Sequence, residues 1–173
     1  MLDNGRAGSI WDQGVSAFDE NIGYGVCSKD GGQGCPSLNW AVVNDTGRGE
    51  VLEVTYAEVG VGMAAIFIGN STGVDMRDYA SGSLKFDIKV TNAGENTTGW
   101  IIKADCTYPC TSGDQAIGTA GLEGWESVSV PVSLLTAGGL DLANVSMGIV
   151  IWPDHAENDG FRYRLDNVCW SVG

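Results

Sequence analysis

Residues 83–90 read SLKFDIKV, a run in which polar and apolar side chains alternate strictly. One parity holds Leu84, Phe86, Ile88 and Val90, and the other holds the serine, the two lysines and the aspartate. Side chains of a β-strand point alternately to opposite faces, so this pattern predicts a strand with one face on a core and the other toward water. Such strands are typical of antiparallel sheets that are solvated on one side.

Similar short runs lie on both sides of this segment, and none has a helical period over a useful length. Clusters of Gly, Asn, Asp and Thr separate them, and the 26 glycines are scattered without a period. Together these features predict an all-β fold, a β-sandwich jelly roll of two antiparallel sheets. The other predicted strands cover 51–57, 63–68, 99–106, 125–132, 145–152 and 161–170, and a single helical turn is expected within 74–80.

The length of 173 residues suits one domain with a sizeable core. We expect this domain to cover 10–173, preceded by a flexible N-terminal segment at 1–9. That segment resembles the end of a linker, so any export signal would already be removed. No stretch of about 18 apolar residues occurs, which argues against a membrane span.

The balance of charged residues limits which classes of molecule the protein is expected to bind. The chain has 9 Lys and Arg against 22 Asp and Glu, a formal net charge of −13. Phosphate backbones attract basic surfaces, so we expect no nucleic acid partner. The same negative charge disfavours sulfated or uronic acid polysaccharides and favours a neutral glycan.

Five cysteines indicate an oxidising compartment. Cys27 and Cys35 bracket a polar loop and Cys106 and Cys110 bracket a tight turn, so we expect two local disulfides and a secreted or cell-surface protein. The alternative is a metal site of four thiolates, although neither spacing is that of a zinc knuckle. Cys169 is left over in the apolar run VCW and is predicted to be a buried free thiol.

Three segments, GSLKFDIKV at 82–90, WESVSVPVSLL at 125–135 and RLDNVCW at 164–170, resemble strands of galactose-binding-like jelly rolls. Segments 11–27, 35–43 and 103–115 extend the similarity to the C-terminal domain of marine exo-β-glucanases of the ExoP type. The resemblance implies an accessory module of an extracellular glycan-degrading enzyme, with that enzyme's catalytic domain as a partner.

The fold that the resemblance implies commonly holds a structural calcium ion where the first strand meets the last. The family pattern points here to Asp19 or Glu20 and to Asp166, with Glu50 as a further candidate ligand. Calcium takes six to eight oxygen ligands, so backbone carbonyl groups would have to contribute. The alternative for Asp166 is capping of a turn through backbone amides.

Aromatic side chains are the first candidates for binding sugar, because a flat ring offers an apolar platform at little entropic cost. Met147, Ile149 and Ile151 are expected to face the core, which puts Trp152 on the opposite face beside the space left by Gly148. Trp152 would then stack on a sugar, or else simply pack.

Two further aromatic candidates flank one strand. Tyr108 lies in the turn between Cys106 and Cys110. Their disulfide either holds Tyr108 ready to contact a ligand or only fixes the loop in place. Trp100, by its parity, is expected to be half buried, and the loops around it and Tyr24 are a second place for a site.

Charged side chains on the outward strand faces are the remaining candidates. Lys103, Asp105, Arg162 and Arg164 would offer paired donors and acceptors to sugar hydroxyls if their strands share a sheet. The alternative is a solvated face with weak ion pairs.

The leading hypothesis is a monomeric, non-catalytic carbohydrate-binding module for a neutral β-glucan, with a laminarin-like β-1,3-glucan favoured. One alternative is a structural domain that packs on a glycoside hydrolase catalytic domain. The other is a small jelly-roll polysaccharide lyase or hydrolase, but the acidic residues show no recognisable catalytic spacing, and no nucleophile or metalloprotease motif occurs.

Overall fold

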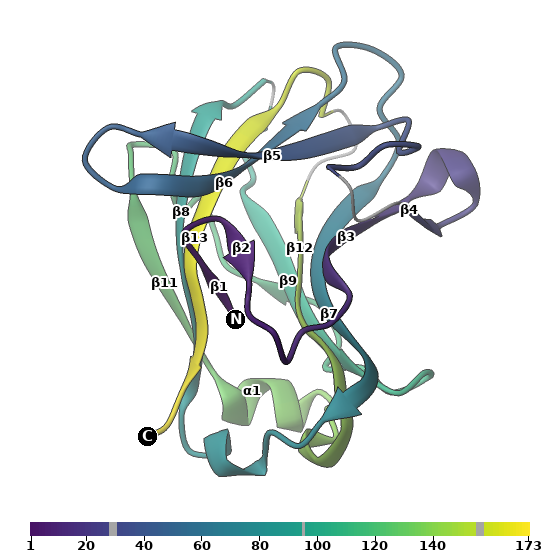
Figure 1. Ribbon diagram of the computed structural model, residues 1–173, viewed down its shortest axis with the longest axis vertical. Helices are drawn as coiled ribbons and strands as arrows, with labels where there is room; N and C mark the ends of the chain where they lie inside the picture. The colour runs from purple at the N-terminus through teal and green to yellow at the C-terminus, as the bar shows by residue number, and fades with distance from the viewer. Residues whose placement is uncertain (28–30, 95, 155–157) are drawn as a thin grey trace.

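Strands drawn from the whole chain pair into two antiparallel sheets that face each other in the computed structural model (Figure 1). The structure describes residues 1–27, 31–94, 96–154 and 158–173. The all-β sandwich of two antiparallel sheets that the sequence predicts is therefore confirmed.

The seven-stranded sheet has the order β11-β8-β13-β1-β2, and β6 and β5 continue it from β13. The run SLKFDIKV lies in β8, between β11 and β13, with Leu84 opposite Val130 on one side and Trp170 on the other. Its strands are β1 (Leu2–Asp3), β2 (Arg6–Ala7), β5 (Leu38–Asp45), β6 (Gly49–Tyr56), β8 (Ser83–Asn92), β11 (Glu126–Pro131) and β13 (Arg162–Ser171).

The six-stranded sheet has the order β10-β9-β12-β7-β3-β4. Figure 1 shows strands β9, β12, β7 and β3 of this sheet to the right of β11, β8 and β13 of the first sheet. Its strands are β3 (Gly14–Asp19), β4 (Gly25–Cys27), β7 (Ala64–Val74), β9 (Trp100–Cys106), β10 (Gln115–Ala116) and β12 (Val145–Pro153). The helical segments are η1 (Glu20–Ile22), η2 (Arg77–Tyr79), α1 (Val132–Ala137) and η3 (Leu142–Asn144).

Two stretches differ from the expectation. Residues 1–9 are not a separate flexible segment, because β1 pairs with β13 and Leu2 is fully buried in the core. The predicted strand at 125–132 ends at Pro131, and Val132 begins the short helix α1, which the sequence pattern did not reveal. Proline has no N–H to give to a ladder, which suits the end of an edge strand.

The predicted cysteine pairing is confirmed, and the prediction for the fifth cysteine is correct in one of its two parts. Cys27 bonds Cys35 and Cys106 bonds Cys110. Cys169 is free, but its side chain is exposed rather than buried. Its side chain points outward from β13, whereas the neighbouring Val168 and Trp170 are buried on the inner face of the sheet.

The core between the sheets contains an aromatic cluster. The ring of Trp100 lies 4.7 Å from that of Tyr163 and 5.3 Å from that of Phe161, and the Trp100 Nε1 donates to the Ala120 carbonyl. Tyr163 is fully buried, and its hydroxyl has no hydrogen-bond partner among the described residues. Burial raises the pKa of this phenol, so it stays neutral.

Tyr163→Phe is expected to raise the free energy of unfolding by about 1 kcal/mol, because the change removes a buried hydroxyl that lacks a partner. Chemical denaturation measures this. Tyr56→Phe is the matched control, since the Tyr56 hydroxyl donates to the Ala64 carbonyl at 2.7 Å and its loss should destabilise. A lower stability of Tyr163→Phe would show that the hydroxyl is satisfied in solution.

Candidate functional site

The outward face of the six-stranded sheet carries an apolar surface apart from the main core. Ile149 and Ile151 of β12 point into the core, whereas Val150 and Trp152 point outward and pack with Ala65 and Phe67 of β7. Phe18 of β3 extends this surface, and its ring stacks on that of Phe67 at 4.7 Å. An apolar surface on the outward face of a sheet indicates that a ligand or a partner covers it.

A groove of about 520 Å³ lies over this surface, and we call it the outer groove. That volume is typical of ligand sites in proteins. Most of its lining comes from β3, β7, β9 and β12, and the turns at its two ends add the rest. The residues that line it are Phe18, Tyr24, Met63, Ala65, Lys103, Asp105, Cys106, Tyr108, Pro109, Cys110, Thr111, Asp114, Ser146, Met147, Val150 and Trp152.

The predicted orientation of Met147 is wrong. Met147 lines the outer groove with Val150 and Trp152, instead of facing the core with Ile149. The register of β12 shifts between Met147 and Ile149, which marks an irregularity of the β-bulge type. An extra residue in a strand reverses the face to which the preceding side chains point. The alternation of side chains along the sequence therefore gives the wrong face for Met147.

Trp152 lies on the face that the sequence predicts but not at an open rim. Its side chain is 8% exposed and packs in the apolar surface, so it forms part of the floor of the groove. Gly148 does not leave space beside it, because a side chain at Gly148 would meet Trp11 and Met1 on the core side.

Lys103 and Asp105 of β9 form the polar wall of the groove. The Lys103 Nζ lies 2.9 Å from the Asp105 Oδ2, and the two side chains are 26% and 14% exposed. The Asp105 Oδ1 is covered and has no hydrogen-bond partner among the described residues. A carboxylate oxygen without a donor in a partly buried place is uncommon, because it loses hydration without a replacement.

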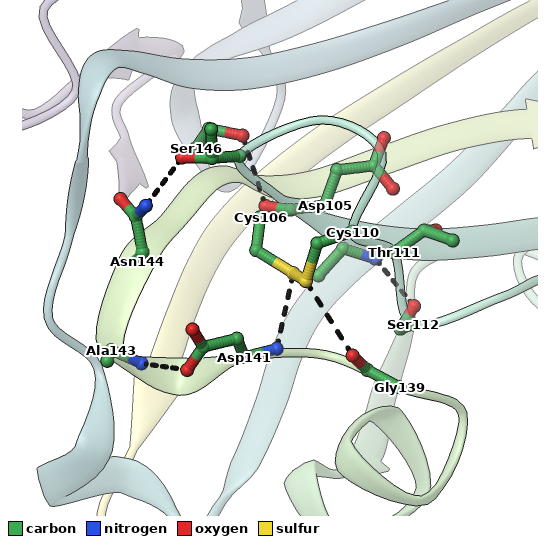
Figure 2. Close-up of a disulfide and its surroundings, with 12 residues drawn as sticks. Asp105, Cys106, Cys110, Thr111, Ser112, Gly139, Asp141, Ala143, Asn144 and Ser146 are labelled. Atoms are coloured by element: carbon green, nitrogen blue, oxygen red, sulfur yellow. Dashed lines mark hydrogen bonds between the residues drawn. A yellow bond between two sulfur atoms is a disulfide. The ribbon is translucent and has the colours of Figure 1, made fainter.

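The turn after β9 presents Tyr108 at this polar end. Figure 2 shows that the Cys106–Cys110 disulfide lies against the chain that leads to β12. The Asp141 N–H donates to the Cys106 Sγ at 3.2 Å, and the Asn144 side-chain amide donates to Thr107 at 2.5 Å. The turn is therefore anchored on both sides, while the Tyr108 ring is 94% exposed and free to contact a ligand.

Tyr24 and Met63 border the opposite end of the groove. Tyr24 has φ of +58°, a left-handed backbone conformation that is uncommon for a bulky residue. Its N–H donates to the Asp19 carbonyl at 2.9 Å, which holds the turn between β3 and β4. The ring is 54% exposed. Tyr24 had only a secondary place among the sequence-based candidates, because no periodic pattern covers the turn.

The other candidate residues do not join this groove. Trp100 is 1% exposed and belongs to the core, so it is not half buried as expected. Arg162 and Arg164 lie on β13 of the seven-stranded sheet, so they do not neighbour Trp152. Arg162 is exposed, and Arg164 is engaged in ion pairs.

These ion pairs form a network on the outward face of the seven-stranded sheet. The Asp45 carboxylate accepts from Arg164 at 2.5 Å, from Lys89 at 3.4 Å and from the Trp125 Nε1 at 3.2 Å. Arg48 lies over the Trp125 ring at 4.3 Å from its centre. Asp45, Arg164, Lys89 and the Trp125 indole therefore already satisfy one another on this face.

The expected calcium ligands do not form a common site. Asp19 is fully buried and accepts from the Asn21 N–H, the Ser37 N–H and the Ser37 hydroxyl. Glu50 is exposed and pairs with Arg6. Burial raises the pKa of Asp166, whose nearest cation is Arg48 at 3.9 Å.

Among the described residues, no group of three or more Asp, Glu, His or Cys side chains is arranged to hold a metal ion. Asp19, Glu50 and Asp166 therefore do not fit calcium as a set, and binding of this ion stays a prediction without assigned ligands.

Comparison with protein-family models identifies the family of the chain. The family model Exop_C, described as galactose-binding domain-like, matches residues 45–167. No curated protein matches the chain. In the described part of the chain, no helix is long and apolar enough to cross a membrane.

The solved structures that resemble the chain show the same fold. The extra C-terminal domain of exo-1,3/1,4-β-glucanase (ExoP) from a Pseudoalteromonas species superposes with a TM-score of 0.62 at 11% identity, over 91% of this chain and 84% of that one. Against the whole of ExoP the TM-score is 0.63 at 11% identity, over 92% of this chain but only 19% of the enzyme.

The family 11 carbohydrate-binding module from Clostridium thermocellum, solved in complex with a β-1,3-1,4-mixed-linked tetrasaccharide, gives a TM-score of 0.50 at 18% identity, over 78% and 84% of the two chains.

Proposed function

Because the chain belongs to the Exop_C family of galactose-binding domain-like modules, we propose that it is the non-catalytic carbohydrate-binding module of a secreted polysaccharide-degrading enzyme, and that its ligand is a neutral β-glucan. The outer groove is the observation that carries this proposal. It combines an apolar floor, a polar wall and an exposed tyrosine at each end, and these are the groups that contact the faces and the hydroxyls of sugar rings.

The dimensions of the groove favour an oligosaccharide over a single sugar. It crosses β9, β12, β7 and β3 and reaches the turn before β4, which are neighbours in the sheet. Adjacent strands lie about 4.8 Å apart, so the two ends are separated by at least roughly 19 Å across the sheet. Tyr108 follows the end of β9 and Tyr24 follows the end of the oppositely directed β3, so a glucan chain would have to lie diagonally over the strands to contact both tyrosines.

Charge supports a neutral ligand. The ionisable groups that line the outer groove include one cation, Lys103, and two carboxylates, Asp105 and Asp114. The whole chain carries a formal charge of −13, which would repel a polyuronate or a sulfated polymer. The two disulfides support an extracellular location, since such bonds persist in oxidising compartments.

Tyr108→Ala is expected to weaken binding to a neutral β-glucan by a factor of roughly 30, the consequence of losing an aromatic contact worth about 2 kcal/mol. The ring is 94% exposed, so the melting temperature should not change. Calorimetry and affinity electrophoresis measure the binding. The control is Leu134→Ala, which removes an exposed apolar side chain on α1, outside the groove. Unchanged binding by Tyr108→Ala would place the ligand elsewhere.

A second candidate function is a structural domain that packs on a catalytic domain. It is favoured by exposed apolar side chains that continue the groove at its β4 end, Tyr24, Val26 and Met63, which are 54%, 59% and 44% exposed. Val26 lies directly opposite Phe18 in the register of β3 and β4. Absence of binding between the isolated domain and any neutral glycan would favour the packing role over the glycan-binding role.

A further inference from the structure

The polar wall of the outer groove suggests which glycosidic linkage is preferred, a question that rests on the proposed function. Lys103 and Asp105 lie two residues apart on β9, so both side chains leave the same face of the strand. An ammonium group that donates and a carboxylate that accepts therefore stand side by side, with the Nζ and Oδ2 atoms 2.9 Å apart.

A donor beside an acceptor is complementary to two adjacent hydroxyl groups. One hydroxyl can accept from the Lys103 ammonium while its neighbour donates to the Asp105 carboxylate. The Asp105 Oδ1 has no donor among the described residues, so a ligand hydroxyl would supply the hydrogen bond that this oxygen lacks. The atom is covered in the structure, but the terminal torsion of an aspartate is soft, and a small rotation would turn Oδ1 toward the groove.

Adjacent free hydroxyls are not present in every β-glucan. In an internal unit linked through carbon 4, the hydroxyls on carbons 2 and 3 are both free and lie next to each other. In an internal unit linked through carbon 3, that oxygen is consumed by the linkage, and the free hydroxyls on carbons 2 and 4 are not neighbours. A site that reads an adjacent pair therefore separates the two linkages inside a chain.

We infer that the Lys103–Asp105 pair binds the adjacent hydroxyls of a 4-linked glucosyl unit, and that the outer groove prefers glucans with such units over pure β-1,3-glucans. Asp105 is then the residue that determines linkage specificity. This reverses the preference for a laminarin-like glucan that the sequence favoured. The apolar floor and the two tyrosines contact either polymer alike, because they meet ring faces rather than particular hydroxyls.

The test compares a β-1,3-1,4-mixed-linkage glucan with a linear β-1,3-glucan of similar length by calorimetry, for the wild-type domain and for Asp105→Asn. We expect the wild type to bind the mixed-linkage polymer at least tenfold more tightly, and Asp105→Asn to lose most of that advantage while it binds the β-1,3-glucan as before. Asp78→Asn makes the same chemical change on η2, outside the groove, and should leave both affinities unchanged.

A melting curve of each variant establishes that it is folded before binding is compared. Equal binding of both polymers by the wild type, or an equal loss for both in Asp105→Asn, would overturn the linkage inference and leave the proposed function standing. Binding of neither polymer would refute the proposed function, and the inference with it.

Discussion

Asp45→Asn is expected to lower the free energy of unfolding by about 3 kcal/mol at neutral pH. Asp45 is the last residue of β5, a strand at one edge of the seven-stranded sheet, and its side chain is 2% exposed. Its carboxylate accepts from Arg164, Lys89 and the Trp125 indole, which come from three different segments. The variant would leave two cations around a neutral amide. Loss of one partner of a buried ion pair costs about 3–5 kcal/mol, and partial exposure of Arg164 and Lys89 argues for the lower end.

The effect of Asp45 should depend on pH. Burial acts to raise the pKa of this carboxyl, but the hydrogen bonds from Arg164, Trp125 and Lys89 outweigh it and hold the pKa below its usual value. A carboxyl whose pKa is lower in the folded protein stabilises the fold above its unfolded-state pKa of about 3.9. That contribution is lost as the pH falls through the lower, folded-state value.

Urea denaturation of wild type and Asp45→Asn at pH 7 and at successively lower pH measures both parts. The difference in unfolding free energy should be largest at neutral pH and should shrink below about pH 4. Glu50→Gln is the control, because its pair with Arg6 is exposed on both sides and such pairs contribute little. A difference that stays constant down to low pH would mean that Asp45 acts through packing and not through its charge.

The interior of this fold could be predicted because it follows local alternation. The segment 83–90 has a strict period-two pattern, and 161–170 alternates on each side of a register shift between Asp166 and Cys169. Both strands lie in the centre of the seven-stranded sheet. Several strands without that pattern were missed. β5 was not predicted. Buried and exposed side chains alternate only over its first residues, and the apolar Val42 is exposed at the sheet edge. Helix α1 spans six residues, too few for a helical period to appear.

The site was predicted only in part, because its parts depend on irregular structure. Lys103, Asp105, Tyr108 and Trp152 all line the outer groove. Met147 was misplaced, since the irregularity in β12 depends on pairing with β7 and β9. A glycine inside a strand often marks a bulge, but Gly148 was interpreted as open space beside Trp152.

Arg162 and Arg164 were grouped with that site for a related reason. Alternation tells which parity a residue has but not which sheet its strand joins, and β13 pairs with β8 and β6 instead of β12.

Trp152→Ala is expected to lower the free energy of unfolding by about 3–5 kcal/mol, the usual loss when a large aromatic side chain is removed from a packed site. For a domain of this size that corresponds to a fall in melting temperature of roughly 10 °C. The ring is 8% exposed and packs in the apolar surface formed with Val150, Ala65 and Phe67. A melting temperature within two or three degrees of the wild type, measured by calorimetry, would contradict this packing.

The same variant should also lose binding, and this separates it from Tyr108→Ala. Trp152 forms the floor of the outer groove, whereas Tyr108 stands at its end on an anchored turn. Removing the floor lowers both stability and affinity, but removing Tyr108 lowers affinity alone. Trp152→Phe keeps an aromatic ring on the floor, so its losses in both quantities should be smaller than those of Trp152→Ala. If Trp152→Ala, compared at a temperature where it is fully folded, binds the glucan as tightly as the wild type, then the ligand contacts the rim of the groove and not its floor.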